Sequence, residues 1–196
     1  MNNLIIHVHG FLSASEAERV SALRKYIHAK GLYVDVISPQ LPETPKAAID
    51  AIEKIIADEN SNRDSISLIG HSLGGYFSTY IASKNQIKAV LVNPVVRGYE
   101  IMCEYFGECY NPHTDKKFNI GADDIAYLIS INVENIPDRN LFMVMQQLGD
   151  EIIDPNDTLS FYNGCKLITV DGGCHDFSNF ENHIESVVEF LYGSHA

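Results

Sequence analysis

Short apolar runs alternate along the chain with longer stretches in which apolar residues recur every three or four positions. The apolar runs, each typical of a buried strand, are 4–8, 33–38, 65–70, 87–93, 141–147 and 166–170. The stretches with helical spacing are 15–30, 44–59, 73–84, 155–163 and 179–192. This alternation predicts an α/β fold, namely a mostly parallel sheet of about six strands with helices on both faces.

One interval interrupts the alternation. Residues 97–139 separate two predicted strands that a much shorter connection could join, and they contain many aromatic residues and one predicted helix near 122–131. Long excursions from an α/β core are commonly lids or binding elements. We therefore expect a single domain over 1–196 with a lid over 97–139. An insertion that only packs on the core is the alternative.

Charge and composition limit the partners. With 45% hydrophobic and 20% charged residues and a formal net charge of −12, the chain is poorly suited to nucleic-acid backbones or anionic membranes. No basic leader and no apolar stretch of membrane-spanning length is seen, so a cytoplasmic monomer or small homo-oligomer is expected. The cysteines are then expected to be free thiols.

The segment GHSLGGYF, residues 70–77, carries the pattern G-x-S-x-G, with Ser72 between Gly70 and Gly74. A predicted strand precedes it and a predicted helix follows it, so Ser72 falls on a sharp turn at the carboxyl edge of the sheet. This placement favours Ser72 as a catalytic nucleophile. A phosphate-binding glycine loop would be longer and would carry a lysine.

A serine hydroxyl needs a base, and the base needs a carboxylate that orients it. In α/β-hydrolases these groups follow the serine in the order acid, then histidine, each after a strand. Here Asp150 follows one predicted strand, and a glycine turn after the last strand delivers His175. We therefore predict Ser72 as nucleophile, Asp150 as acid and His175 as base. Glu151 and Asp154 are nearby alternatives to Asp150.

The oxygen that becomes negative during attack on a carbonyl needs backbone N–H donors that are fixed in advance. One is expected from Leu73, directly after the nucleophile. The other is expected from the loop after the first predicted strand, where HVHGF ends. Gly10 permits a tight bend there, so the N–H of Phe11 is predicted to face the site.

Two groups of residues suggest a metal site, and both are incomplete. His7 and His9 have H-x-H spacing, but no further ligand follows at a useful distance along the chain. Cys103, Cys109 and His113 lack a fourth ligand and the C-x-x-C spacing of zinc sites. We therefore expect no metal and no cofactor.

With these residues in place, the sequence resembles the YqiA-like family of small bacterial esterases, within the α/β-hydrolase superfamily. The resemblance covers almost the whole chain and is carried by HGFLS (9–13), PQLP (39–42), GHSLGGY (70–76), NPVVRGYE (93–100), QQLGDEIID (146–154) and GGCHDFSNFE (172–181). The stretch YFGECYNPHT (105–114) resembles the lid of that family.

The resemblance implies a compact α/β-hydrolase that cleaves carboxylic esters, with acyl thioesters as a related possibility. It places the family's nucleophile, acid and base on Ser72, Asp150 and His175. The sequence departs from the family pattern at His71 and Cys174, beside these groups, and at Gly98, directly after Arg97. These departures leave the choice of substrate open.

Four residues of the excursion are predicted to line the substrate pocket, namely Arg97, Tyr99, Tyr105 and Phe106. The aromatic residues suggest an apolar acyl or alcohol group. Arg97 could anchor the lid or meet a substrate anion, and an ion pair with Glu100 is the alternative.

Together these features predict a serine hydrolase that cleaves small-molecule esters through an acyl-enzyme intermediate. One alternative is an acyl-CoA thioesterase that uses the same three residues. The negative net charge disfavours it unless Arg97, Lys116 and Lys117 form a local basic patch. The other alternative is a non-catalytic ligand-binding protein that kept the fold.

Overall fold

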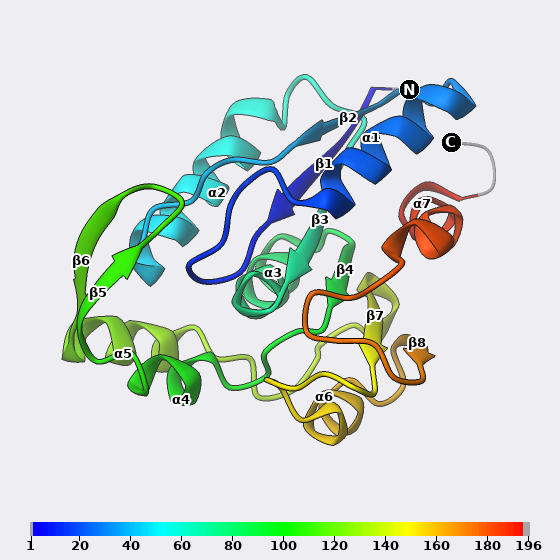
Figure 1. Cartoon of the computed structure of the whole chain (residues 1–196). Coiled ribbons are helices and arrows are strands. Elements are labelled where there is room, and N and C mark those ends of the chain that lie inside the picture. The colour runs from blue at the N-terminus through cyan, green and yellow to red at the C-terminus, as the bar shows by residue number, and fades with distance from the viewer. Residues whose placement is uncertain (1, 194–196) are drawn as a thin grey trace.

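A wholly parallel sheet of six strands forms the centre of the molecule, in the order β2-β1-β3-β4-β7-β8 (Figure 1). The computed structural model describes residues 2–193; residues 1 and 194–196 of the predicted domain lie outside that range. The strands are β1 (Asn3–Val8), β2 (Val34–Ile37), β3 (Ser65–His71), β4 (Ala89–Val92), β7 (Phe142–Gln147) and β8 (Lys166–Val170). All six predicted strands are therefore present.

Helices cover both faces of the sheet, as predicted. They are α1 (Glu18–Lys30), α2 (Pro45–Glu59), α3 (Leu73–Asn85), α6 (Pro155–Phe161) and α7 (Ile184–Tyr192), with short 3₁₀ turns at Arg139–Leu141 and Phe180–His183. Leu23 of α1 and Val187 of α7 belong to one buried cluster. Ile52 of α2 and Ile81 of α3 belong to the other, on the opposite face. Burial on both faces explains why the central strands read as continuous apolar runs.

The strand register aligns the carboxyl ends that carry the site. Strand β1 pairs with β3 from Asn3↔Ser65 to Val8↔Gly70. The loop after β1 therefore begins level with the turn after β3. Strand β7 pairs with β4 in parallel, so its carboxyl end lies at the same edge of the sheet.

The excursion over 97–139 is more structured than the sequence indicated. It contains α4 (Gly98–Cys103), an antiparallel hairpin of β5 (Gly107–Asn111) and β6 (Lys116–Ile120), and α5 (Ala122–Ser130). Only the last of these was predicted. The hairpin was missed because its strands are short and only partly buried, with few apolar positions to reveal a period of two.

The excursion packs beside α2 and α3 (Figure 1). The Tyr76 hydroxyl of α3 donates to the Leu128 carbonyl of α5 at 2.6 Å. The ring of Phe118 on β6 meets the ring of Phe11 edge-on, with 5.9 Å between centroids. The hairpin is thus connected to the loop that follows β1. No helix in residues 2–193 is long and apolar enough to cross a lipid bilayer.

Candidate active site

Ser72 occupies a strained turn between β3 and α3. Its φ of 55° and ψ of −124° are unusual for a residue with a side chain. The neighbouring glycines make this turn possible. A Cβ on Gly74 would collide with the Val8 carbonyl, and one on Gly70 would collide with the Gly74 carbonyl. The strand and the helix therefore meet closely enough to project Ser72 from the sheet edge.

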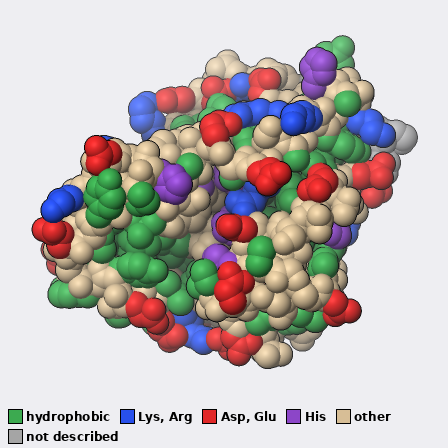
Figure 2. All heavy atoms as spheres, viewed as in Figure 1, with side chains coloured by type: hydrophobic (Ala, Val, Ile, Leu, Met, Phe, Trp, Pro, Cys, Tyr) green, Lys and Arg blue, Asp and Glu red, His purple; other side chains and the backbone are tan. Residues whose placement is uncertain are grey.

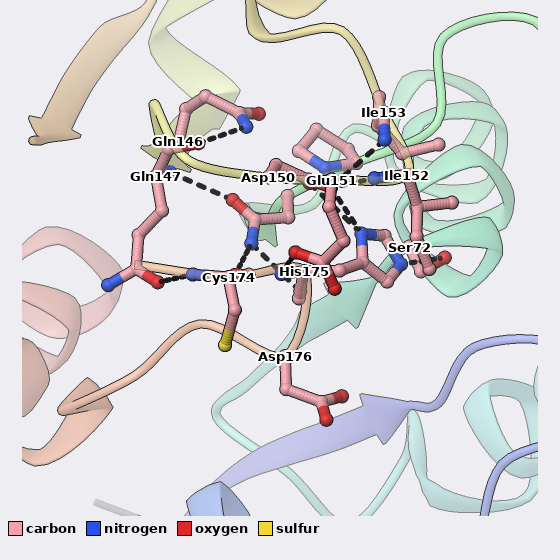
Figure 3. A network of polar contacts seen from close by, with 12 residues as sticks. Ser72, Gln146, Gln147, Asp150, Glu151, Ile152, Ile153, Cys174, His175 and Asp176 are labelled. Carbon is pink, nitrogen blue, oxygen red and sulfur yellow. Dashed lines mark hydrogen bonds and ion pairs between the residues drawn. The ribbon is translucent and has the colours of Figure 1, made fainter. Parts of the chain in front are cut away.

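The three residues predicted as nucleophile, base and acid lie in one hydrogen-bonded row (Figure 3). Ser72 Oγ is 2.9 Å from His175 Nε2. His175 Nδ1 lies 2.9 Å from both carboxylate oxygens of Asp150. Because an ionised carboxylate only accepts, Nδ1 carries the proton of the neutral ring. The lone pair of Nε2 then faces the Ser72 hydroxyl, which is the arrangement that proton removal requires.

Asp150 is held as an anion although its side chain is fully buried. Burial acts to raise the pKa of its carboxyl. The hydrogen bond with His175 and the backbone N–H groups of Ile153 and Ile152, each 2.9 Å from Oδ1, outweigh burial and lower the pKa. The alternatives left by the sequence have other partners. Glu151 accepts from the His175 backbone N–H at 2.9 Å, and Asp154 caps α6.

Two amides that sequence reasoning missed fix the loop that carries His175. The side-chain amide of Asn93, at the end of β4, donates to the Cys174 and His175 carbonyls at 3.0 and 2.8 Å. Gln147 Oε1, at the end of β7, accepts from the backbone N–H groups of Cys174 and Ser178 at 2.9 Å. The available signal was the presence of an amide side chain directly at the end of a buried strand.

The side chains of His71 and Arg19 also bond to the backbone of the loop that carries His175. His71 Nε2 lies 2.9 Å from the His175 carbonyl and donates to it. Burial and nearby Arg19 lower the pKa of His71 well below its usual value, so the ring is neutral beside His175. The buried Arg19 guanidinium donates to the Asp176 carbonyl at 2.6 Å. Together these contacts hold the backbone at residues 175 and 176, while the His71 ring beside His175 carries no charge.

The predicted oxyanion donors lie next to Ser72. A Cβ on Gly10 would stand 3.1 Å from the Cβ of Ser72, so the loop after β1 passes very close to the nucleophile. Within residues 2–193, the backbone N–H groups of Phe11 and Leu73 have no hydrogen-bond acceptor. They are therefore free to donate to a substrate oxygen.

His9 fixes the peptide between Gly10 and Phe11. Its Nε2 accepts from the Leu41 backbone N–H at 3.0 Å, so the proton is on Nδ1, which donates to the Gly10 carbonyl at 2.8 Å. The C=O and N–H of one peptide point in opposite directions. Because the Gly10 carbonyl points toward the His9 ring, the Phe11 N–H points away from that ring.

No metal-binding cluster of His, Cys, Asp and Glu occurs among residues 2–193. The side chain of His7 forms a hydrogen bond instead, with its Nδ1 2.9 Å from Ser38 Oγ.

Two hollows flank Ser72. One is a mainly apolar cavity that is lined by Phe11, Leu73, Phe77 and Phe118 among others. The other is an open groove that contains Ser72 and His175. Figure 2 looks onto this face, where histidine side chains lie along a hollow between an apolar area and a surface of mixed charge. The first hollow is thus lined by Leu73, directly after Ser72, and the second by Ser72 itself.

The four side chains predicted to line the substrate pocket do not line either of these hollows. Arg97 forms the ion pair that the sequence left as its alternative, because its guanidinium pairs with Glu100 at 2.8 Å and also with Asp157 at 2.6 Å on the surface. Tyr99 packs against the buried cluster that also contains Ile52 and Ile81. The side chain of Phe106 points to solvent, since the residue is 64% exposed. Tyr105 contacts the site indirectly, since its ring lies 4.9 Å from that of Phe11.

Comparison with known structures identifies the fold as that of the α/β-hydrolases. Est1E from Butyrivibrio proteoclasticus with bound ferulic acid is similar over 96% of this chain and 87% of its own, with 20% identity and a TM-score of 0.76. Mouse alpha/beta hydrolase domain-containing protein 10 is similar over 96% and 90%, with 17% identity and a TM-score of 0.70. The esterase domain of a Rhodothermus marinus protein matches over 98% and 85%, with 16% identity and a TM-score of 0.67.

The family is shown by a sequence model. The model described as "Uncharacterised protein family (UPF0227)" matches residues 4–192. The chain therefore belongs to this family, the YqiA-like esterases that its sequence motifs resemble.

Proposed function

We propose that the protein is a serine hydrolase that cleaves carboxylic esters of small molecules through an acyl-enzyme intermediate on Ser72. The observation that carries this proposal is the row of hydrogen bonds from Ser72 Oγ through both nitrogens of His175 to Asp150. The strained turn at Ser72 and the free N–H groups beside it support the same chemistry. Membership of an esterase family agrees with it.

The first half of the reaction forms the acyl-enzyme. His175 Nε2 takes the hydroxyl proton of Ser72 while Oγ bonds to the carbonyl carbon, and the π electrons of the carbonyl move onto its oxygen. The N–H groups of Phe11 and Leu73 donate to this oxyanion. Asp150 stabilises the imidazolium. The carbonyl then re-forms, the bond to the alcohol oxygen breaks, and His175 gives its proton to the departing alcohol.

The second half releases the acid. His175 takes a proton from water as the water oxygen attacks the acyl carbon, and a second oxyanion forms against the same donors. When it collapses, the bond to Ser72 Oγ breaks and His175 returns the proton to Oγ. The enzyme is restored and a carboxylic acid leaves. No external electron acceptor or cofactor enters this balance.

We also propose that the excursion over 97–139 acts as a lid over the acyl side of the site. Phe118 and Asn111 of its hairpin line the apolar cavity. The rings of Phe118 and Tyr105 both contact Phe11, whose N–H is a proposed oxyanion donor. A cytoplasmic location is proposed as well, since the four cysteines are free thiols.

The test is hydrolysis of p-nitrophenyl esters from acetyl to palmitoyl by the native protein and by Ser72→Ala. We expect turnover by the native protein and a loss of about 10⁴-fold or more in kcat for the variant. The acyl length that gives the highest kcat/KM reports the length of acyl chain that the site accommodates. Equal rates for the two proteins contradict the mechanism. An inactive native protein with an intact fold favours a ligand-binding role instead.

A further inference from the structure

One charged side chain interrupts the apolar wall of the cavity beside Ser72. Glu43 lies in the loop between β2 and α2, and its side chain is 11% exposed. It lines the same cavity as Phe11 and Leu73, whose N–H groups are the proposed oxyanion donors. The residues of both proposed oxyanion donors and Glu43 therefore line one cavity.

The contacts of Glu43 keep its carboxyl ionised. Burial acts to raise the pKa of this group. The Thr114 hydroxyl, which donates to Oε1 at 2.8 Å, the backbone N–H of Glu43 and the Lys116 ammonium at 3.7 Å outweigh burial and lower the pKa. Thr114 and Lys116 belong to the β5–β6 hairpin, so this carboxylate also ties the proposed lid to the core.

Besides Glu43, no charged side chain lines this cavity among the described residues at neutral pH. His9 is neutral there, because burial lowers its pKa and the Leu41 N–H occupies its second nitrogen. The compensating Lys116 stands outside the lining and is 64% exposed. Among the described residues that line the cavity, an acyl group thus meets one carboxylate and no cation.

We propose that Glu43 determines the acyl specificity of this enzyme. The cavity takes acyl groups whose far end is apolar or donates a hydrogen bond, such as a hydroxyl, and it rejects acyl groups that end in a carboxylate. A second anion beside a largely buried carboxylate is repelled in surroundings of low dielectric constant. A hydroxyl can instead donate a charge-assisted hydrogen bond to the carboxylate. This inference rests on the proposed function, because it assumes that the acyl carbonyl sits at Ser72.

The experiment compares p-nitrophenyl esters of equal length that differ only at the far end of the acyl group. The six-carbon set is the hexanoate, the 6-hydroxyhexanoate and the monoester of hexanedioic acid; an eight-carbon set repeats the comparison at greater reach. For the set with the higher turnover, we expect the diacid monoester to have a kcat/KM at least tenfold below the alkanoate, mainly through KM. The kcat/KM of the hydroxy ester is expected to equal or exceed that of the alkanoate ester.

Three variants separate charge from structure. Glu43→Gln keeps an oxygen that can accept from Thr114 but removes the charge, so the diacid-to-alkanoate ratio should rise at least tenfold. Lys116→Gln removes the compensating cation and should lower that ratio further. Glu53→Gln is the matched control, because its carboxylate also pairs with a lysine, Lys84 at 2.6 Å, away from the cavity. It should keep the native ratio.

The inference and the proposed function fail in different ways. If the native protein hydrolyses all three esters of a set within twofold, or if Glu43→Gln rejects the diacid monoester as strongly as the native protein, Glu43 does not set specificity. The hydrolase proposal would survive that result. If none of the six esters is turned over faster than by Ser72→Ala, the proposed function fails and the inference fails with it.

Discussion

The sheet edge around Ser72 and the excursion over 97–139 are built by different means. At the sheet edge, buried side chains hold the backbone on which the reacting groups stand; Asn93 and Gln147 are 0% and 2% exposed, and each bonds to the loop of His175. The excursion is attached mainly by apolar packing of side chains such as Leu128, by ring contacts with Phe11 and by the hydrogen bond from Tyr76 to the Leu128 carbonyl. Its hairpin also carries pairs at the surface, and the one between Lys117 and Glu108 has both side chains about three-quarters exposed.

This difference matches the two tasks that we propose for these regions. Proton transfer between serine and histidine tolerates little displacement, so its partners are fixed by buried hydrogen bonds. A wall that receives acyl groups can adapt without loss of the chemistry. Substitutions at the sheet edge should therefore lower kcat, whereas substitutions in the excursion should mainly change KM.

Asp150→Asn is expected to have the largest effect among the supporting residues. The amide cannot hold His175 in the productive tautomer or stabilise its charge, so kcat should fall by about 10⁴-fold. Ester hydrolysis at saturating substrate measures this. Asp154→Asn is the control, because Asp154 caps α6 and is not bonded to His175. A comparable loss in Asp154→Asn would mean that the acid has been misassigned.

Gln147→Leu tests whether the buried amide fixes the base. Leucine leaves the N–H groups of Cys174 and Ser178 without their acceptor, which typically costs about 1–3 kcal/mol of stability per unsatisfied group. We also expect kcat to fall by about tenfold or more, with KM nearly constant, because the His175 loop can shift. A thermal melt and steady-state kinetics report the two effects. A destabilised variant with native kcat would show that the amide is only structural.

The carboxylate of Asp150 should also make stability depend on pH. Its folded-state pKa is lowered, so it binds its proton less readily in the folded than in the unfolded chain. Its contribution is therefore present above the unfolded pKa of about 3.9 and is lost as the pH falls through the folded value. The difference in unfolding free energy between the native protein and Asp150→Asn should shrink from pH 6 to pH 3. A difference that grows on acidification contradicts this sign.

Phe118→Ala tests the proposed lid. Removal of the ring opens the apolar cavity and deletes the contact with Phe11. We expect KM for an apolar acyl ester to rise by about threefold to tenfold, since part of the acyl contact is lost, while kcat changes less. A loss confined to kcat would assign Phe118 to the catalytic edge instead.

Arg97→Gln should have the smallest effect. Its ion pairs with Glu100 and Asp157 are partly exposed, and such pairs contribute about 0.2–1 kcal/mol. Stability should change within that range and ester kinetics should stay native. A large rise in KM would restore the role in substrate binding that the sequence suggested for Arg97.

The fold was predictable because its strands are buried on both faces. Runs such as that of β4, in which every residue is buried, stand out in the sequence without any partner information. The turn at Ser72 was predictable for a local reason, since only glycines fit beside it. Asp150 and His175 followed from their places directly after strands.

The remaining parts depend on contacts between distant segments. The hairpin β5–β6 has strands that are only partly buried, so its hydrophobic pattern is weak. Glu43 bonds to Thr114 because the hairpin folds over the loop before α2, a contact that no local pattern encodes. For Arg97 the pair with the nearby Glu100 was foreseen as an alternative, but the second partner Asp157 was not, because it is 60 residues away.

The central claim is that His175 and Asp150 activate Ser72, and labelling by a fluorophosphonate probe tests it most directly. The probe forms a covalent bond with an activated serine, and peptide mass spectrometry locates the adduct. We predict one adduct, on Ser72, in the native protein, and strongly reduced labelling in His175→Ala although Ser72 is still present. A folded native protein that is not labelled, or that is labelled at another serine, would contradict the account.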